Sequence, residues 1–182
     1  MTDENESLPA GELSAVHRGR TAVIDCVVSA GIDLEFIGQL VSIEHGAATT
    51  VHLAPDALRT APHQIEVIEI SHEASVTLRP EEAQPSPSGL GPSPLPYDEA
   101  IEHQASDLNL HVVGRPISFV SRLDNGTWYS AYGRLVGLDA AIVDGQSRVL
   151  VRLIGIDADL GTAPEEFRLE PDTILHSAAP RP

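Results

Sequence analysis

The residue types that catalyse reactions or bind metals occur in this chain, but their spacing favours neither activity. No two of the eight histidines have the His-x-x-x-His spacing of a helical zinc site, and the single cysteine, Cys26, has no second thiolate to share a metal. The carboxylate pairs Glu81-Glu82 and Glu165-Glu166 lack a partnered histidine or nucleophile for acid-base chemistry. We therefore expect no enzyme, no metal site and no cofactor. The histidines are His17, His45, His52, His63, His72, His103, His111 and His176.

One sequence pattern occurs twice along the chain. Gly19-Arg20 and the segment 38–43 (GQLVSI) recur at a constant offset as Gly114-Arg115 and 133–138 (GRLVGL). A second echo closes each copy, at 60–67 and at 162–169. Such self-similarity indicates two copies of one small domain. A domain of roughly 60 residues is marginal in stability alone, so contacts with the other copy or with other chains would add stability.

Apolar and polar residues alternate within each copy, which predicts strands. Residues 21–28 superpose on 116–123, and the shared apolar face is expected to be the core. Its members are Ala22, Ile24 and Val28 in the first copy, and Ile117, Phe119 and Leu123 in the second. Further strands are expected at 49–53, 65–70, 148–154 and 166–169.

Glycines are expected to shape the connections between these strands. A turn is predicted at Ala30-Gly31 and another at 124–126, where Asn125-Gly126 is a strong hairpin signal. Gly38 and Gly133 are expected to mark a bend or bulge where a strand turns a barrel corner. About five short strands per copy describe an all-β chain of two tandem five-stranded SH3/Sm-like barrels, each preceded by a short helix or turn.

The barrels are flanked by tails and joined by a proline-rich linker. The linker carries six prolines among Ser and Gly, a composition that favours a semi-rigid polyproline spacer. The residues 98–104 that follow it begin with acids, as a short helix would. The expected order is a flexible acidic tail at 1–14, barrel 1 at 15–79, the linker at 80–96, the short helix with barrel 2 at 97–177, and a tail at 178–182.

The charge is strongly acidic and unevenly spread. The net charge is −16, of which −5 lies in 19–79, −3 in 114–176 and the remaining −8 in the tails and linker. All 11 basic residues are arginine, and they form no basic stripe of the kind that phosphate-backbone binding needs. Nucleic acid is therefore an unlikely partner, and a mimic of nucleic acid would need acids at regular spacing on one face.

Comparison of the two copies isolates an aromatic surface candidate. If Leu34 and Phe36 face the core, so do their counterparts Tyr129 and Ala131. The opposite face then carries acids and Ile37 in the first copy but Trp128 and Tyr132 in the second. Trp and Tyr are enriched in binding hot spots, so an interface anchor is one interpretation, and packing against the linker or the other barrel is the alternative. The interface candidates are Trp128, Tyr132 and Ile37.

The segment 132–139 (YGRLVGLD), with the Gly-Arg and alternating strand before it, resembles the first motif of the Sm/Hfq-like proteins, and 32–44 resembles it more loosely. The resemblance implies a strongly bent five-stranded barrel, ring assembly through edge strands, and RNA binding around the pore. The chain lacks that family's asparagine after Asp139, its later Arg-Gly motif and the basic histidine motif of the Hfq branch. Fold and assembly mode are therefore carried over, without RNA-binding residues.

These observations predict a non-catalytic interaction or assembly protein that works through barrel edge strands and the aromatic patch. Its partner would be another protein or a second copy of the chain, with a ring-like homo-oligomer as one form of assembly. Two alternatives stay open: an Sm/Hfq-like RNA-binding module, and an acidic nucleic-acid mimic. The first alternative would use Arg115, Arg122, Arg134, Arg148 and Arg152. The acidic N-terminus has no signal-peptide pattern and no segment is apolar enough to span a membrane, so a cytoplasmic location is expected.

Overall fold

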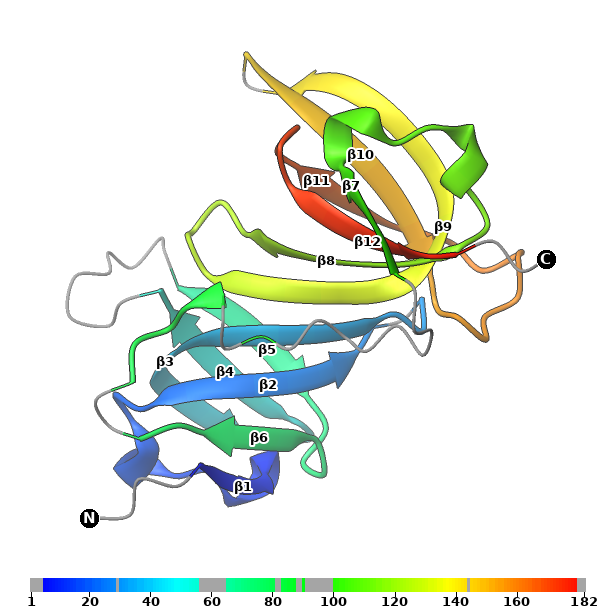
Figure 1. Cartoon of the computed structure of the whole chain (residues 1–182). Coiled ribbons are helices and arrows are strands. Elements are labelled where there is room, and N and C mark those ends of the chain that lie inside the picture. Colours follow the sequence, from blue (N-terminus) through cyan, green and yellow to red (C-terminus); the bar gives the residue numbers. More distant parts are fainter. Residues whose placement is uncertain are drawn as a thin grey trace. The chain divides into compact units, whose positions relative to one another are not determined.

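The computed structural model describes residues 5–28, 30–55, 65–80, 83–87, 90, 100–143 and 145–179. This part of the chain is all-β, as expected, with only short 3-10 helices between antiparallel strands (Figure 1). The strands are β1 (Glu6–Pro9), β2 (Thr21–Val27), β3 (Asp33–His45), β4 (Thr49–Ala54), β5 (Glu66–Ile70), β6 (Ser75–Leu78), β7 (Ala100–Gln104), β8 (Pro116–Arg122), β9 (Trp128–Val143), β10 (Gln146–Ile154), β11 (Glu165–Leu169) and β12 (Ile174–Ala178).

The chain divides into two compact units, and neither is a single continuous stretch of sequence. Unit 1 consists of Met1–Cys26, Glu35–Leu90 and Arg122–Tyr129. Unit 2 consists of Val27–Leu34, Gly91–Ser121 and Ser130–Pro182. Each unit therefore includes a short hairpin segment, 122–129 in unit 1 and 27–34 in unit 2, whose flanking strands lie mainly in the other unit.

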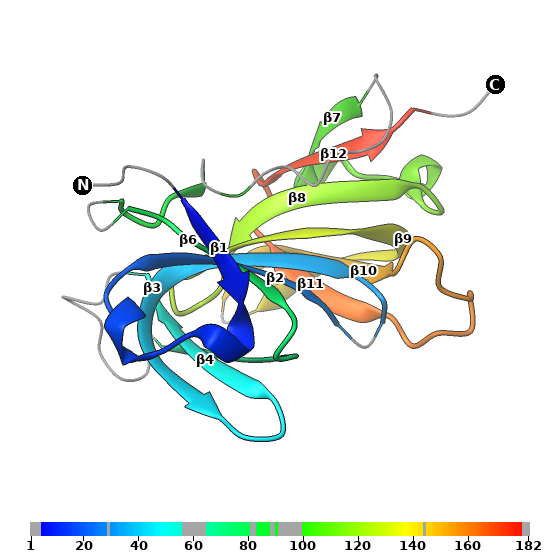
Figure 2. The same ribbon diagram turned by 90° about the horizontal axis from the view of Figure 1, so that it is seen from below.

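In unit 1 the strands follow the order β1-β6-β2-β3-β4-β5. The long strand β3 bends near Gly38, where a Cβ atom would lie 2.9 Å from the carbonyl oxygen of Ala54. The β3–β4 register shifts between Leu40 and Ser42. A glycine is thus required where the two backbones approach, and the irregularity expected at Gly38 lies three residues further along, at Val41. Figure 2 shows β3 and β4 continuing together as a curved hairpin.

Unit 2 has the order β7-β12-β8-β9-β10-β11. A Cβ atom on Gly133 would lie 2.7 Å from the carbonyl oxygen of Ile154, and the β9–β10 register shifts between Arg152 and Leu153. Here too the irregularity lies three residues after the glycine, at Val136. Beyond it, β9 and β10 extend as a projecting hairpin (Figure 1), on which the side chain of Ile142 is 81% exposed.

The alternating patterns place most of the core as expected, but Val28 and Leu123, at the ends of the predicted faces, are only half-buried. Ala22 and Ile24 of β2 are completely buried, and so are Ile117 and, at 2% exposure, Phe119 of β8. Full burial of one large aliphatic side chain contributes about 1.5–3 kcal/mol. The largest fully buried side chains are Ile24, Ile32, Ile37, Leu40, Leu53, Leu78, Ile117, Leu135, Leu153, Ile154, Leu169 and Leu175.

The segment before the second copy is not the helix predicted over 98–104. Ala100–Gln104 forms strand β7 and pairs with β12. Pairing with a distant strand overrides the local helix signal of the acids that precede it. Short 3-10 helices follow at Ala105–Asp107 and Leu110–Val112.

The start of the first copy differs in the same way from the tail predicted over 1–14. Glu6–Pro9 forms strand β1, which pairs with β6, and the side chain of Leu13 is 2% exposed. Short 3-10 helices lie at Ala10–Glu12 and Ala15–His17. The acidic composition of the segment gives no strand signal. The strand forms because its backbone pairs with β6, a contact that the local sequence does not reveal.

Most of the predicted linker, 80–96, lies outside the described residues. In its described part the carbonyl oxygen of Ala83 accepts a hydrogen bond from the hydroxyl of Thr21, and Leu90 is buried. Of the C-terminal tail predicted at 178–182, Ala178 is the last residue of β12 and 180–182 lie outside the described residues. Within the described part of the chain, no helix has the length and apolar character needed to cross a membrane.

Candidate functional site

Trp128 lies at the base of the 122–129 hairpin in unit 1 and is half-buried. The guanidinium carbon of Arg122 lies 4.7 Å from the centre of its ring. Arg122 Nε also donates a hydrogen bond of 3.1 Å to the carbonyl oxygen of Gly126. A cation-π contact at such a site contributes roughly 0.5–1 kcal/mol. One ring face of Trp128 is thus covered by a residue of its own hairpin, and the side chain remains partly exposed.

The other two interface candidates differ from each other. Tyr132 is half-buried in unit 2. Ile37, predicted to lie on the outward face, is completely buried, so its assignment to a surface was wrong. The five consecutive positions from Phe36 to Leu40 are all buried, because β3 is covered on both faces where it bends. Alternation in the sequence cannot reveal this, since a strand buried on both faces does not alternate.

The predicted core face of the same strands is confirmed. Leu34, Phe36, Tyr129 and Ala131 are all buried, with exposures of 8% or less. Within unit 1 the rings of Phe36 and Tyr129 have centroids 6.2 Å apart and planes inclined at 31°. This centroid distance lies in the range of favourable aromatic pairs.

Most of the candidate arginines are engaged with acceptors of the protein itself. On β10, Arg148 pairs with Glu170, and Arg152 Nε lies 3.1 Å from Glu166 Oε2. Arg134 donates to the carbonyl oxygen of Ile156. Arg115 is half-buried. The pKa of His103 is lowered, first by the burial of His103 itself and second by the positive charge of Arg115.

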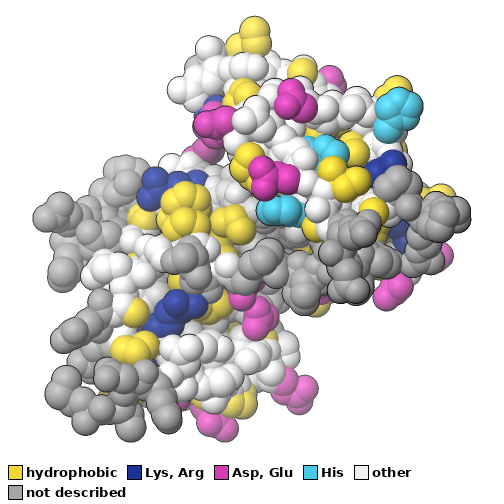
Figure 3. Space-filling model, in the orientation of Figure 1, with side chains coloured by type: hydrophobic (Ala, Val, Ile, Leu, Met, Phe, Trp, Pro, Cys, Tyr) yellow, Lys and Arg dark blue, Asp and Glu magenta, His cyan; other side chains and the backbone are white. Residues whose placement is uncertain are grey.

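No uninterrupted basic stripe results from these arginines in the part of the chain that the structure describes. On the face drawn in Figure 3, basic side chains stand in separate places among acidic and neutral ones. The ion pairs on β10 also supply carboxylates next to the positive charges, which weakens attraction for phosphate.

In unit 1 the hairpin 122–129 packs against Glu66 and Pro55, a contact surface that we call the seat of this hairpin. Asn125 Nδ2 donates a hydrogen bond of 2.7 Å to Glu66 Oε2, and Gly126, with φ +93°, faces the ring of Pro55. Burial raises the pKa of Glu66, and the hydrogen bond from Asn125 acts in the opposite direction. The Asn-Gly turn was predicted from the sequence, but its contact with Glu66 was not. The two residues are 59 positions apart, and no local pattern links them.

Unit 2 has its own seat for the segment 27–34. The amide of Gly155 donates a hydrogen bond of 2.8 Å to the carbonyl oxygen of Ala30. A Cβ atom on Gly155 would overlap the carbonyl of Gly31, whose Cα would be 2.9 Å away. The side chain of Ile32 is completely buried next to Gly133. This seat depends on direct contact between two glycine backbones.

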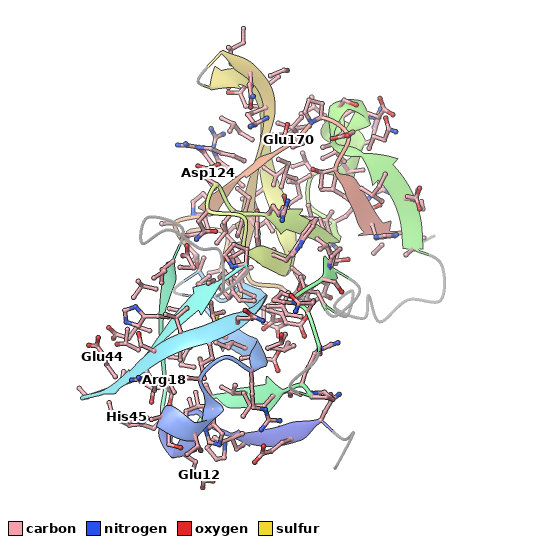
Figure 4. All side chains as sticks on the ribbon, turned by 90° about the vertical axis from the view of Figure 1, so that its left-hand side faces the viewer. Glu12, Arg18, Glu44, His45, Asp124 and Glu170 are labelled. Atoms are coloured by element: carbon pink, nitrogen blue, oxygen red, sulfur yellow. The ribbon has the colours of Figure 1, made fainter. Side chains whose placement is uncertain are left out.

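A polar cluster joins three segments of unit 1. The hydroxyl of buried Thr49 lies 2.8 Å from His72 Nδ1 and 3.3 Å from His45 Nδ1. The Nε2 atoms face carbonyl oxygens, that of His45 facing Leu13 at 2.9 Å and that of His72 facing Gly46 at 3.2 Å. Figure 4 shows His45 along one side of unit 1 with Glu12, Arg18 and Glu44.

The hydrogen-bond partners assign the protons of this cluster. A carbonyl oxygen can only accept, so both Nε2 atoms carry a proton. The single hydroxyl proton of Thr49 can then be donated to only one of the two Nδ1 atoms. Through these hydrogen bonds the cluster connects Leu13, which follows the first 3-10 helix, with the β3–β4 and β5–β6 turns. Spacing gave no signal for it, because the two histidines are far apart in sequence.

Two carboxyl groups approach each other across β2 and β3. Burial raises the pKa of Asp25, and a hydrogen bond with Glu35 acts in the opposite direction. Burial, aided by the charge of Asp25, raises the pKa of the neighbouring Cys26 thiol to about 11. A thiol with so high a pKa is largely protonated at neutral pH and is a poor nucleophile.

Among the residues that the structure describes, no group of three or more histidine, cysteine, aspartate or glutamate side chains is placed to hold a metal ion. No protein-family model, no curated protein and no solved structure matches this chain.

Proposed function

We propose that this chain is a non-catalytic assembly subunit made of two tandem small barrels of the SH3/Sm-like type, and that it acts in the cytoplasm. The repeated sequence pattern supports the duplication. So does the shared strand order, in which β1-β6-β2-β3-β4-β5 corresponds to β7-β12-β8-β9-β10-β11. Equivalent hydrogen bonds occur in the two units: the amide of Gly19 donates to Leu40, and that of Gly114 donates to Leu135.

The observation that carries the proposal is the unequal protection of the sheet edges. Four strands of the described chain have a single neighbour: β1, β5, β7 and β11. Strand β1 is four residues long and ends in Pro9, while β5 and β11 each carry two glutamates. Proline, short length and charge are the devices that prevent edge-to-edge pairing. Strand β7 has no proline and a single acid, Glu102, so it is the least protected edge.

The proposed occupant of this edge is β7 of a second copy of the chain. Antiparallel pairing of identical edges forms a closed, two-fold contact in which both partners use the same surface. Backbone hydrogen bonds supply the affinity in such strand addition. Trp128 and Tyr132 are the proposed aromatic anchors of the assembly, because both are partly exposed and large.

The experiment is the solution mass of the full chain by size-exclusion chromatography with light scattering, read at protein and nucleic-acid wavelengths. The test variant is Glu102→Lys with Gln104→Lys, which places two lysines on the exposed face of β7. Glu12→Lys with Ala15→Lys makes the same change in charge at exposed positions of unit 1. We expect an oligomer for the parent and the control, and a monomer for the β7 variant.

A monomeric parent would contradict the assembly role, and an oligomer unaffected by the β7 lysines would contradict the use of this edge. Nucleic acid that co-elutes with the parent would favour the RNA-binding alternative and its arginines. The anchors are tested in the same assay with Trp128→Ala combined with Tyr132→Ala. This variant should keep the circular dichroism of the parent and dissociate at least tenfold more readily.

A further inference from the structure

The two hairpin segments have the same internal geometry. In 27–34 the amide of Val28 donates to Ile32 at 3.1 Å and that of Gly31 donates to Val28 at 2.7 Å. In 122–129 the amide of Leu123 donates to Thr127 at 2.9 Å and that of Gly126 donates to Leu123 at 2.8 Å. Both turning glycines have positive φ angles, +74° at Gly31 and +93° at Gly126. The described residues of the two hairpins therefore share one backbone hydrogen-bond pattern.

Their seats are not equivalent. The seat of unit 1 presents Pro55, whose ring carbons lie 3.4 and 3.5 Å from the position of a Cβ on Gly126. The seat of unit 2 presents Gly155, where a Cβ would overlap the carbonyl of Gly31. Any side chain at this position would displace the 27–34 hairpin. A proline at this position is therefore compatible with the 122–129 hairpin, as Pro55 shows. It is incompatible with the 27–34 hairpin, which approaches the backbone of Gly155 too closely. Each seat therefore favours one of the two hairpins.

Side-chain chemistry strengthens this preference. The unit 1 seat offers the Glu66 carboxylate to the Asn125 amide, whereas Ala30, the counterpart of Asn125 in the other hairpin, has no side-chain donor. Discrimination thus combines an attractive contact in one seat with a steric requirement in the other.

We propose that the seats also accept the same hairpins from a second copy of this chain, which gives a dimer by reciprocal hairpin exchange. The contacts within each unit are the same whether segment 122–129 comes from its own chain or from another. Only the connectivity differs, through the backbone at Ser121-Arg122 and Tyr129-Ser130. Exchange of an identical element is a low-cost route to dimers. The intrachain hairpin competes at an effective concentration of the order of millimolar, so exchange requires folding at high chain concentration.

The test places one member of the Asn125–Glu66 contact in each of two full-length chains. One chain carries Asn125→Cys and the other Glu66→Cys, both with Cys26→Ser. The chains are unfolded together in urea, refolded at about millimolar concentration, and treated with dibromobimane, which bridges two neighbouring thiols. The Asn125→Cys chain refolded with a Glu12→Cys, Cys26→Ser chain is the control, because Glu12 is exposed and is not part of the seat.

We expect a cross-linked band at twice the chain mass, at least tenfold stronger than in the control. A band no stronger than in the control would overturn the proposal. A single chain with both Glu66→Cys and Asn125→Cys, refolded at high dilution, should become bridged within the monomer. Failure to do so would overturn the seat contact and the proposal with it.

All of these chains also carry Glu102→Lys and Gln104→Lys. Exchange must persist in this background, because it does not depend on β7. Loss of edge-mediated assembly and loss of hairpin exchange are thereby measured separately.

Discussion

Units 1 and 2 share a strand order but differ in the side chains at the start of one strand pair, which is β4–β5 in unit 1 and β10–β11 in unit 2. In unit 1, Thr49 pairs with Ile70 in the β4–β5 register and contacts two histidines. In unit 2, Val149 pairs with Leu169 at the corresponding position, next to the ion pair of Arg148 with Glu170. The backbone pairing therefore tolerates a polar cluster or an apolar contact. The bend glycines, Gly38 and Gly133, do not allow the same variation, because each faces a backbone carbonyl.

The largest expected effect tests the seat of unit 2. Gly155→Val should destabilise the protein by more than about 3 kcal/mol, because the new side chain would occupy the space of Gly31. Urea unfolding gives the free energy of unfolding, and hydrogen exchange of the β10 and β11 amides locates the loss. Gly161→Val is the control, since no atom lies within 4 Å of its Cβ position and it should change stability by less than about 0.5 kcal/mol. Equal effects of the two substitutions would contradict the seat.

The bend glycines should behave alike in the two units. Gly133→Ala and Gly38→Ala each place a methyl group against a backbone carbonyl, at 2.7 and 2.9 Å. We expect each to cost about 1–3 kcal/mol in the free energy of unfolding, with Gly133→Ala the larger. If only one of them destabilises, the units do not share the bend as a common requirement.

A substitution at Thr49 makes unit 1 resemble unit 2. Thr49→Val removes the hydroxyl between His45 and His72 at a completely buried position and should cost about 1–2 kcal/mol. The reciprocal Val149→Thr should cost about 1–3 kcal/mol if the new hydroxyl lacks a partner. Thermal unfolding of both variants measures the change in stability that each substitution causes. A stabilising Thr49→Val would show that the histidine cluster is not a net stabilising feature.

The smallest effect concerns pH and the seat of unit 1. Because burial raises the pKa of Glu66 above its ordinary 4.5, its contribution to stability is complete below the unfolded pKa and is lost as pH rises through the folded pKa. Glu66→Gln keeps an acceptor for Asn125 but does not ionise. We expect the variant to gain stability relative to the parent as pH rises from about 4 to 7, measured by urea unfolding. Glu73→Gln, at an exposed position, should show a smaller change.

Local patterns in the sequence predicted the strands that alternate and the turns that need glycine. Strands β2, β4, β5, β8, β10 and β11 and the Asn125-Gly126 turn follow from such patterns. Strands β1 and β7 do not, because their signals are weak or helical and their pairing with β6 and β12 decides their structure.

Long-range features were harder to predict for the same physical reason. Ile37 is buried because β3 is covered on both faces at its bend. The placement of each hairpin in its unit depends on contacts such as Asn125 with Glu66, which join residues 59 positions apart. Spacing within one segment carries no information about such pairs.

The solution mass of the full chain, measured with absorbance at two wavelengths over a dilution series, tests the assembly role most directly. We expect a protein-only oligomer that dissociates on dilution and that the β7 lysines reduce to a monomer. A parent chain that is monomeric at every concentration would contradict it.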